Sequence, residues 1–174
     1  MRYLNRYVIT YNGEVYNFED SRKKLIKLGY KFKSNSDTEV ILALYDKYKE
    51  KCLDHLRGMF SFAIYDTKEE KVFFAVGRLG KKPLKYYRDG NNFIFASEIK
   101  AILTQKEVET SPDMVAIHHY LTYGYVTSPR TGFEKIYKLQ PGHYMILDLK
   151  TNKLEKNRYW KLDFAQKLIL TEEE

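Results

Sequence analysis

Three adjacent residues, Asn12, Gly13 and Glu14, combine the donor groups and the backbone freedom that carbonyl chemistry needs. An Asn amide and a Gly backbone N–H are neutral donors of the kind that stabilise a developing oxyanion. Glycine also lets a ligand approach the main chain closely, because it has no Cβ. An ordinary Asn-Gly hairpin turn is the alternative, since the same pair favours that turn. The triplet alone leaves both interpretations open.

The residues around the triplet predict the elements that position it. Residues 7–11 (YVITY) are mostly β-branched or aromatic, which is typical of a strand. We expect this strand to run directly into a polar turn at residues 12–14. Asn17, with Asp20 three residues later, is then a candidate N-cap of a helix that Gly29 ends.

The histidines and the cysteine are weaker candidates for chemistry. His118 and His119 are adjacent, so on a helix they point about 100° apart and cannot share a metal ion. His55 and His143 are isolated in the sequence. Cys52 lies in a helix-like segment, where a packed thiol is more typical than a nucleophile. We therefore expect no metal site and no catalytic role for Cys52.

Patterns for nucleotide and nucleic-acid binding are missing. The chain has neither GxxxxGK(S/T) nor GxGxxG, and residues 77–80 (GRLG) are too short for a phosphate-binding loop. We therefore expect no cofactor in this chain. The formal charge is +7, from 30 Lys and Arg against 23 Asp and Glu, but the basic residues are scattered. This pattern indicates a basic surface rather than a nucleic-acid partner.

Composition also indicates the cellular compartment of the protein. A single cysteine in 174 residues excludes an internal disulfide framework and fits a reducing cytoplasm. The sequence has no secretion signal at its start, and no apolar run approaches the ~20 residues that span a bilayer. We therefore expect a cytoplasmic protein without membrane contact.

The order of elements predicts an α+β domain of stacked sheets and helices. Residues 59–66 (MFSFAIYD) are almost wholly apolar, as in a strand covered on both faces. Hairpins are expected over 59–76 and 84–96, and a last strand pair is expected at 142–147 and 154–160. Helices are expected from Ser36 or Asp37, at 52–56, at 99–104 and from 111 onward, with 129–139 as a loop. We assign residues 1–161 to one domain and 162–174 to a tail.

Six blocks of sequence carry a family resemblance, and they occur in a fixed order. The blocks are residues 11–17 (YNGEVYN), 35–42 (NSDTEVIL), 58–66 (GMFSFAIYD), 78–84 (RLGKKPL), 95–103 (FASEIKAIL) and 123–144 (YGYVTSPRTGFEKIYKLQPGHY). Together they resemble the glutaminase domain of glutamine-hydrolysing asparagine synthetases. The resemblance runs from Arg6 to Trp160, nearly the whole chain.

The resemblance implies a fold and a reaction. The fold is the four-layer αββα sandwich of N-terminal-nucleophile hydrolases, which agrees with the stacked sheets expected above. The reaction hydrolyses the side-chain amide of L-glutamine and passes ammonia to a C-terminal synthetase domain that makes asparagine from aspartate. ATP and Mg²⁺ belong to that second domain, so the resemblance implies no cofactor here.

The resemblance also assigns roles to four residues. Asn12 and Gly13 correspond to the oxyanion hole, and Glu14 and Asp37 correspond to the carboxylates that hold the α-ammonium group of glutamine. The chemistry fits, since two carboxylates suit an ammonium ion and two neutral donors suit a tetrahedral oxygen. A helix N-cap is the alternative role for Asp37.

The chain departs from the family pattern in three places. The family nucleophile, an N-terminal Cys, has no counterpart before Asn12, so we expect a fold incomplete at its N-terminus. Val76 and Gly77 stand where the family has Arg-Asp, and the synthetase domain is missing. We expect these 174 residues alone to hydrolyse no glutamine. Uncovered sheet edges would favour a homodimer, and a non-catalytic module that binds glutamine or a partner is the alternative function.

Overall fold

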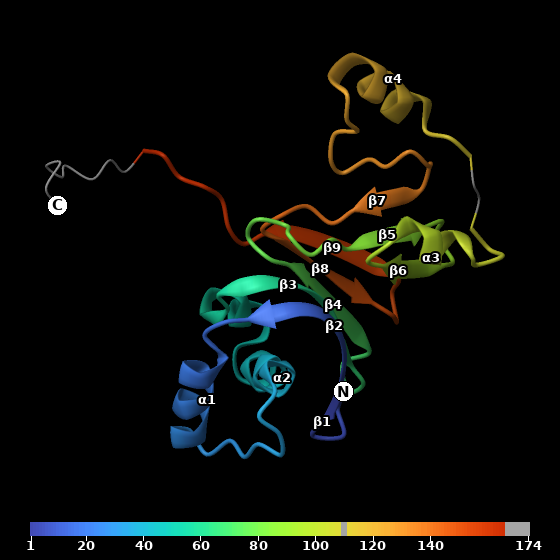
Figure 1. The fold of residues 1–174 in the computed structure, drawn as a ribbon. Helices are drawn as coiled ribbons and strands as arrows, with labels where there is room; N and C mark the ends of the chain where they lie inside the picture. Colours follow the sequence, from blue (N-terminus) through green and yellow to red (C-terminus); the bar gives the residue numbers. More distant parts are fainter. Residues whose placement is uncertain (109–110, 166–174) are drawn as a thin grey trace, which may run out of the picture.

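Two antiparallel sheets form the centre of the fold in a computed structural model that describes residues 1–108 and 111–165 (Figure 1). The larger sheet has the order β1-β2-β3-β4-β8-β9, and the smaller has the order β6-β5-β7. The strands of the larger sheet are β1 (Arg2–Tyr3), β2 (Tyr7–Val15), β3 (Gly58–Asp66), β4 (Lys71–Val76), β8 (His143–Asp148) and β9 (Lys153–Arg158). Those of the smaller sheet are β5 (Lys85–Arg88), β6 (Phe93–Ala96) and β7 (Ile136–Lys138).

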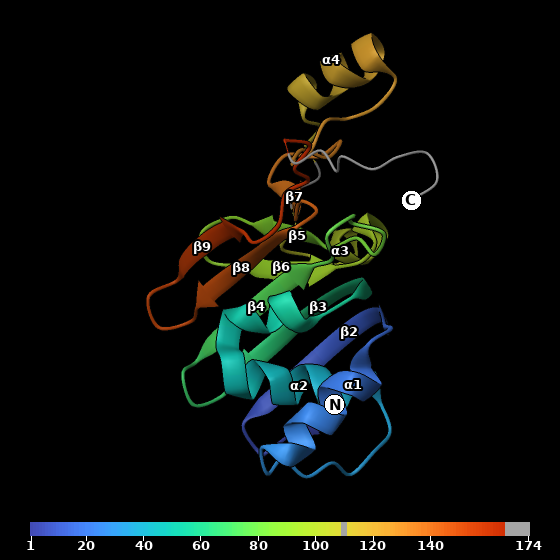
Figure 2. The same cartoon turned by 90° about the vertical axis from the view of Figure 1, so that its left-hand side faces the viewer.

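Helices lie outside both sheets, which gives four layers (Figure 2). The helices are α1 (Phe18–Lys27), α2 (Asp37–Tyr48), the 3₁₀ helix η1 (Lys49–His55), α3 (Ile99–Leu103) and α4 (Met114–Tyr123). Between α1, α2 and the larger sheet lies a buried cluster that includes Leu25, Val40, Ile41, Phe60, Phe62 and Phe73. On the other face of the smaller sheet, Ile102 of α3 packs with Tyr87 and Ile136. The expected αββα layering is therefore confirmed.

Strand β3 runs through the middle of the larger sheet and is covered on both faces. Phe60, Phe62 and Ile64 point toward the helices, whereas Ala63 points toward the smaller sheet. The second cluster joins the two sheets through Ala63, Phe74, Val76, Leu84, Tyr86 and Met145. Apolar residues at successive positions are needed for such a strand, because neighbouring side chains point to opposite faces.

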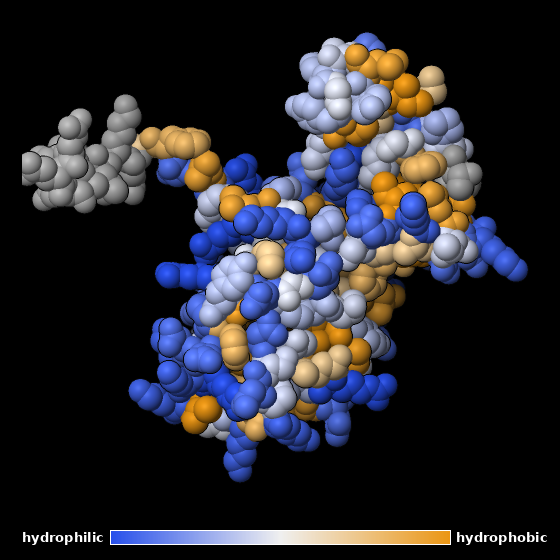
Figure 3. Space-filling view, viewed as in Figure 1, coloured by the Kyte–Doolittle hydropathy of each residue, from blue (hydrophilic) through white to orange (hydrophobic). Residues whose placement is uncertain are grey.

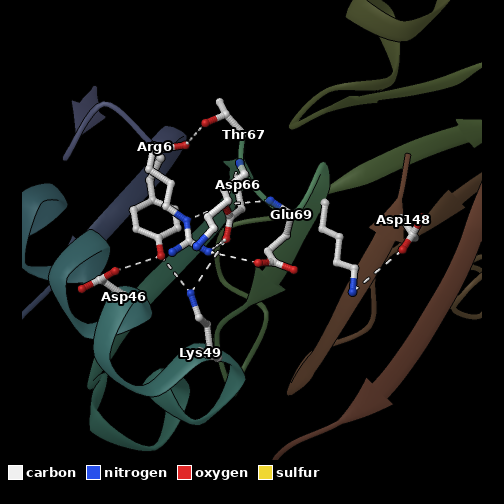
Figure 4. A network of polar contacts seen from close by, with 10 residues as sticks. Arg6, Asp46, Lys49, Asp66, Thr67, Glu69 and Asp148 are labelled. Carbon is white, nitrogen blue, oxygen red and sulfur yellow. Dashed lines mark hydrogen bonds and ion pairs between the residues drawn. The ribbon is translucent and has the colours of Figure 1, made fainter. Parts of the chain in front are cut away.

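A network of polar contacts fixes the loop between β1 and β2 against the turn between β3 and β4 (Figure 4). The guanidinium of Arg6 donates two hydrogen bonds of 2.7 Å to the carboxylate of Asp66, whose side chain is 2% exposed. Lys49 Nζ lies 3.8 Å from the same carboxylate and donates to the Tyr7 hydroxyl at 2.8 Å. That hydroxyl donates to Asp46 at 2.9 Å. The network therefore also holds the C-terminal end of α2 to the sheet.

Two predicted helix caps have different outcomes. Ser36 Oγ accepts a hydrogen bond from Thr38 N at 3.1 Å, so Ser36 is the cap of α2 and the N-cap alternative for Asp37 is wrong. Asn17 stands at the N-cap of α1, but its side chain makes no capping hydrogen bond. Instead it donates to His55 O and accepts from Arg57 N, both at 2.9 Å. Asn17 thereby joins the start of α1 to the residues that enter β3.

The C-terminal third is more sheet-like than expected. Residues 136–138 form β7 rather than a loop, because the second edge of β5 needs a partner and Tyr137 pairs with Tyr86. The hairpin of β8 and β9 is confirmed with small shifts in its bounds. Of the predicted tail, residues 162–165 have no regular structure, and 166–174 lie outside the described residues. Of the helices in the described part of the chain, none has the length and apolarity to cross a bilayer.

Candidate functional site

The Asn-Gly-Glu triplet lies inside β2 and not in a turn. Asn12 pairs with Ser61, Gly13 with Phe60 and Glu14 with Met59, and the antiparallel ladder continues to Val15. The expected polar turn and its hairpin alternative are therefore both wrong. The physical reason is the length of β3, which offers ladder partners to β2 beyond its apolar part.

Gly13 allows an unusually close approach of β2 and β3. Its φ is +147°, a conformation that residues with a Cβ rarely adopt. A Cβ built on Gly13 would lie 2.1 Å from Met59 O and 2.7 Å from Phe60 Cα. Both of these are backbone atoms, so no side-chain rotation could relieve the overlap. The structure therefore requires glycine at this position.

Asn12 faces the smaller sheet and a pocket between the two sheets. Its amide nitrogen donates to Ser97 Oγ at 3.2 Å, just beyond the end of β6. The carbonyl of Ser97 accepts a hydrogen bond of 2.6 Å from Lys85 Nζ, which holds this segment to β5. The pocket has a volume of about 360 Å³, and its walls include Asn12, Ser61, Leu84, Phe95 and Ser97. The amide is therefore exposed to a polar space large enough for a small ligand.

Glu14 and Asp37 lie at the same end of β2 but have different surroundings. Glu14 points to the same side of the strand as Asn12, and its exposed carboxylate has no hydrogen bond or ion pair with the described residues. Asp37 begins α2, and its Oδ2 accepts from the Tyr11 hydroxyl at 2.7 Å and from Val15 N at 3.0 Å. Asp37 is thus bound to the strand one residue beyond Glu14.

Tyr11 is held as a neutral hydrogen-bond donor beside these carboxylates. Burial raises the pKa of its hydroxyl, and the hydrogen bond to Asp37 and the negative charges of Asp37 and Glu14 raise it further. The hydroxyl consequently keeps its proton and continues to donate to Asp37 at any physiological pH.

The remaining candidates lie away from this strand end. Cys52 is fully buried in η1, as expected for a packed thiol, and burial raises its pKa far above the usual range, so the reactive thiolate is suppressed. His119 on α4 shares a hydrogen bond of 2.7 Å with Thr127. Within residues 1–108 and 111–165, no three His, Cys, Asp or Glu side chains are grouped so that they could hold a metal ion.

Sequence reasoning missed Ser97 and Lys85 as neighbours of the site. Ser97 directly precedes Glu98, which occupies the N-cap position of α3. Ser97 is 85 residues from Asn12 in the sequence, so their contact depends on how the two sheets stack. The one available signal was that Ser97 falls in one of the six blocks, which marked the segment but not its partner.

The layered fold defines a class of protein through its structural neighbours. Glutamine phosphoribosylpyrophosphate amidotransferase from Bacillus subtilis, complexed with ADP and GMP, has a TM-score of 0.62 at 19% identity, over 91% of this chain and 30% of that chain. A glutamine aminotransferase class-II domain protein from Silicibacter pomeroyi has a TM-score of 0.51 at 14% identity, over 88% of this chain and 68% of that chain. The fold is that of glutamine amidotransferases of the N-terminal-nucleophile type.

Sequence comparison gives the family. A family model described as the glutamine amidotransferase domain matches residues 1–160, and the chain belongs to this family. Glutamine-hydrolyzing asparagine synthetase 3 of Bacillus subtilis is 41% identical over 158 residues, 90% of this chain and 25% of the relative. Putative glutamine-hydrolyzing asparagine synthetase 2 of Methanocaldococcus jannaschii is 38% identical, over 89% of this chain and 30% of the relative. Amidase chry2 of Gibberella zeae is 33% identical, over 90% of this chain and 22% of the relative.

The chain thus matches the glutaminase domains of asparagine synthetases. It spans between a fifth and a third of the length of these relatives.

Proposed function

We propose that this chain is the part of a glutamine-dependent asparagine synthetase that binds L-glutamine and stabilises the oxyanion formed when its amide is hydrolysed. In this proposal the released ammonia serves a C-terminal synthetase domain, where ATP and Mg²⁺ are used to convert aspartate to asparagine. The observation that carries the proposal is the Asn12–Glu14 strand beside a polar pocket, in a chain that shares 41% identity with an asparagine synthetase. The single cysteine supports a cytoplasmic setting for the protein.

Asn12 and Gly13 are proposed to stabilise the oxyanion that forms when the glutamine amide is attacked. The Asn12 amide is exposed, and the hydrogen bond that it donates to Ser97 Oγ is long at 3.2 Å. Exchanging such a weak contact for a charge-assisted bond to an oxyanion is favourable. The role proposed for Gly13 is that of its backbone N–H, since the place of its missing Cβ is filled by Met59 O and Phe60 Cα of β3.

Glu14 and Asp37 are proposed to hold the α-ammonium group of glutamine. Glu14 is available because its carboxylate is exposed and has no described partner. Asp37 uses Oδ2 for Tyr11 and Val15, whereas its Oδ1 has only a 3.4 Å contact with Thr38 Oγ1. One oxygen of each carboxylate can therefore accept from an ammonium ion.

None of these 174 residues is proposed as the nucleophile of the reaction. Cys52 is the single cysteine, and it is fully buried with a raised pKa. It also has no α-amino group that could serve as the base. The chain by itself is therefore expected to bind glutamine without hydrolysing it.

Isothermal titration calorimetry with L-glutamine tests the binding proposal. Removing the carboxylate charge in Glu14→Gln is expected to weaken binding by about tenfold or more, since hydrogen bonds to charged groups contribute about 1.5–3 kcal/mol. A second variant, Asn12→Ala, removes the proposed amide donor, and Asn91→Ala is its control. Asn91 is exposed in the β5–β6 turn, and among the described residues only its backbone N–H is hydrogen-bonded. Absence of a glutamine signal for the unmodified chain would contradict the proposal.

We also propose that the chain forms homodimers through α4. This helix stands away from the two sheets, and apolar side chains gather on its surface (Figure 3). Exposed residues of α4 include Met114, Tyr120 and Leu121, the last of them 78% exposed, whereas only Ala116 is buried. An apolar surface of this kind is typical of an interface.

A further inference from the structure

A second pocket opens where β3 begins and β4 ends. It is lined by Gly58–Phe60 of β3 and by the loop Gly77–Lys81 after β4. Trp160 and Leu162 line it from the C-terminal side. The two strand ends meet because β3 and β4 are antiparallel neighbours, with Ser61 opposite Val76. The pocket has a volume of about 450 Å³, which lies in the range of small-molecule sites.

Three positively charged residues line this pocket, and no acidic residue does. They are Arg57, Arg78 and Lys81. Within the described part of the chain, none of their side chains has a hydrogen bond or an ion pair with another residue. The Nε of Arg78 is buried and has no hydrogen-bond partner. A buried donor without a partner is costly, and a bound anion would remove that cost.

The rest of the lining is apolar. Leu56 is buried, while Leu79 and Leu162 are 69% and 58% exposed at the mouth beside Tyr16 and Trp160. Exposed leucines next to uncompensated guanidinium groups fit a ligand with two different ends. Arginine side chains bind carboxylate and phosphate groups through paired N–H donors, and the leucine and tryptophan side chains cover an apolar body.

We propose that this pocket binds a small amphipathic anion, an apolar or aromatic body that ends in a carboxylate or a phosphate. Arg78 and Lys81 bind the anionic group from the loop after β4, and Arg57 binds it from the start of β3. Gly77 precedes Arg78 and also lines the pocket. A Cβ on Gly77 would lie within 3.4 Å of Phe60 N and Phe60 O, and Phe60 is another residue of the lining. Because glycine has no side chain, this position supplies no carboxylate that would neutralise the three cations.

Trp160 makes the proposal directly measurable, because it is the single tryptophan of the chain and lines the pocket. The fluorescence of Trp160, excited selectively, would be recorded during titration with 4-phenylbutyrate, with 4-phenylbutyl phosphate and with the neutral 4-phenylbutyramide. We expect saturable changes with one or both anions, binding that weakens as salt is added, and at least about tenfold weaker binding of the amide. The tighter of the two anions identifies the preferred ligand class. The indole N–H signal in NMR spectra gives a second, independent readout.

Four variants separate binding by this pocket from a general charge effect. Arg78→Gln and Lys81→Gln are each expected to weaken anion binding about tenfold, and Gly77→Asp is expected to abolish it by supplying an internal carboxylate. Lys106→Gln removes the same charge from an exposed position outside the pocket and is expected to change nothing. Circular dichroism checks that each variant is folded. Equal affinity for the acid and the amide, equal effects of Arg78→Gln and Lys106→Gln, or no saturable signal in either readout would overturn the proposal.

Discussion

Replacing Gly13 by alanine tests how closely β2 and β3 approach at the candidate site. The added Cβ would lie 2.1 Å from Met59 O and 2.7 Å from Phe60 Cα. Since both neighbours are backbone atoms of β3, the two strands must separate to accommodate the methyl group. The substitution also forces an alanine to adopt a φ of +147°. Steric overlap and backbone strain therefore act together at this residue.

The expected loss of stability follows from these two contributions. Overpacking in a well-packed region costs about 1–3 kcal/mol, and a residue in a disfavoured backbone conformation costs about 1–3 kcal/mol. Together they give a loss of about 2–6 kcal/mol, against a total stability of about 5–15 kcal/mol for a typical domain. If the free energy of unfolding falls by about 2 kcal/mol per molar urea, the unfolding midpoint should fall by about 1–3 M.

Urea unfolding followed by circular dichroism measures this shift, and three other glycines separate its causes. Gly58→Ala tests overlap without a positive φ, because its Cβ would lie 2.1 Å from Glu14 O. Gly90→Ala tests strain without overlap, since Gly90 has a φ of +98° and open space around it. Gly132→Ala has neither feature and serves as the baseline. If Gly13→Ala shifts the midpoint no more than Gly90→Ala does, the close approach of the strands is refuted.

The remaining predictions concern the polar network, the buried thiol and the exposed helix. Asp66→Asn should cost about 3 kcal/mol in urea unfolding, because the guanidinium of Arg6 loses two charge-assisted hydrogen bonds and keeps, among the described carboxylates, only that of Glu69, at 3.6 Å; a loss below that of an exposed Asp→Asn change would contradict this. Burial alone would raise the pKa of Asp66, but hydrogen bonds from Arg6 and from two backbone N–H groups hold it below the usual value. The stability it confers should thus be complete above about pH 4, the unfolded pKa, and be lost as the pH falls through the lower folded pKa, so Asp66→Asn should flatten the pH profile there. Cys52 should react with a maleimide only after denaturation, and rapid labelling of the native protein would disprove its burial. Light scattering should show dimers that Leu121→Lys converts to monomers, and a monomeric unmodified chain at high concentration would rule out the proposed interface.

The layers of the fold could be predicted because the strongest patterns in the sequence are set by burial. The apolar run at 59–66 predicts a strand covered on both faces, and β3 is such a strand. Helix starts are local signals: Asn17 is at the predicted N-cap position of α1, and Ser36 is one of the two residues predicted to start α2. By contrast, β7 has only three residues and forms because it pairs with the edge of β5. Its own sequence is therefore too short to predict a strand.

The candidate site was harder to predict than the fold because its geometry depends on pairing between distant residues. Asn-Gly reads as a turn when only neighbours are considered, yet β3 extends the ladder through Gly13. The role of Asp37 in binding Tyr11 and Val15 also depends on how α2 packs against β2. Residue types single out this stretch of chain as a candidate, whereas its conformation is decided by tertiary contacts.

The strand order has a consequence for aggregation. The larger sheet ends on one side at β1, whose two residues pair only with Tyr7 and Val8, so the later residues of β2 form the rest of that edge. On the other side it ends at β9, whose sequence KLEKNR carries four charged side chains. Short or charged edges resist the addition of a foreign strand. In the smaller sheet, β7 is short and its outer side forms a bridge from Tyr137 to Arg130, whereas β6 has the uncharged sequence FIFA and pairs on one side only among the described residues. Among the described residues, β6 and the part of β2 beyond Val8 therefore offer edges to a strand from another molecule, and a single Lys in β6 would protect the first of them.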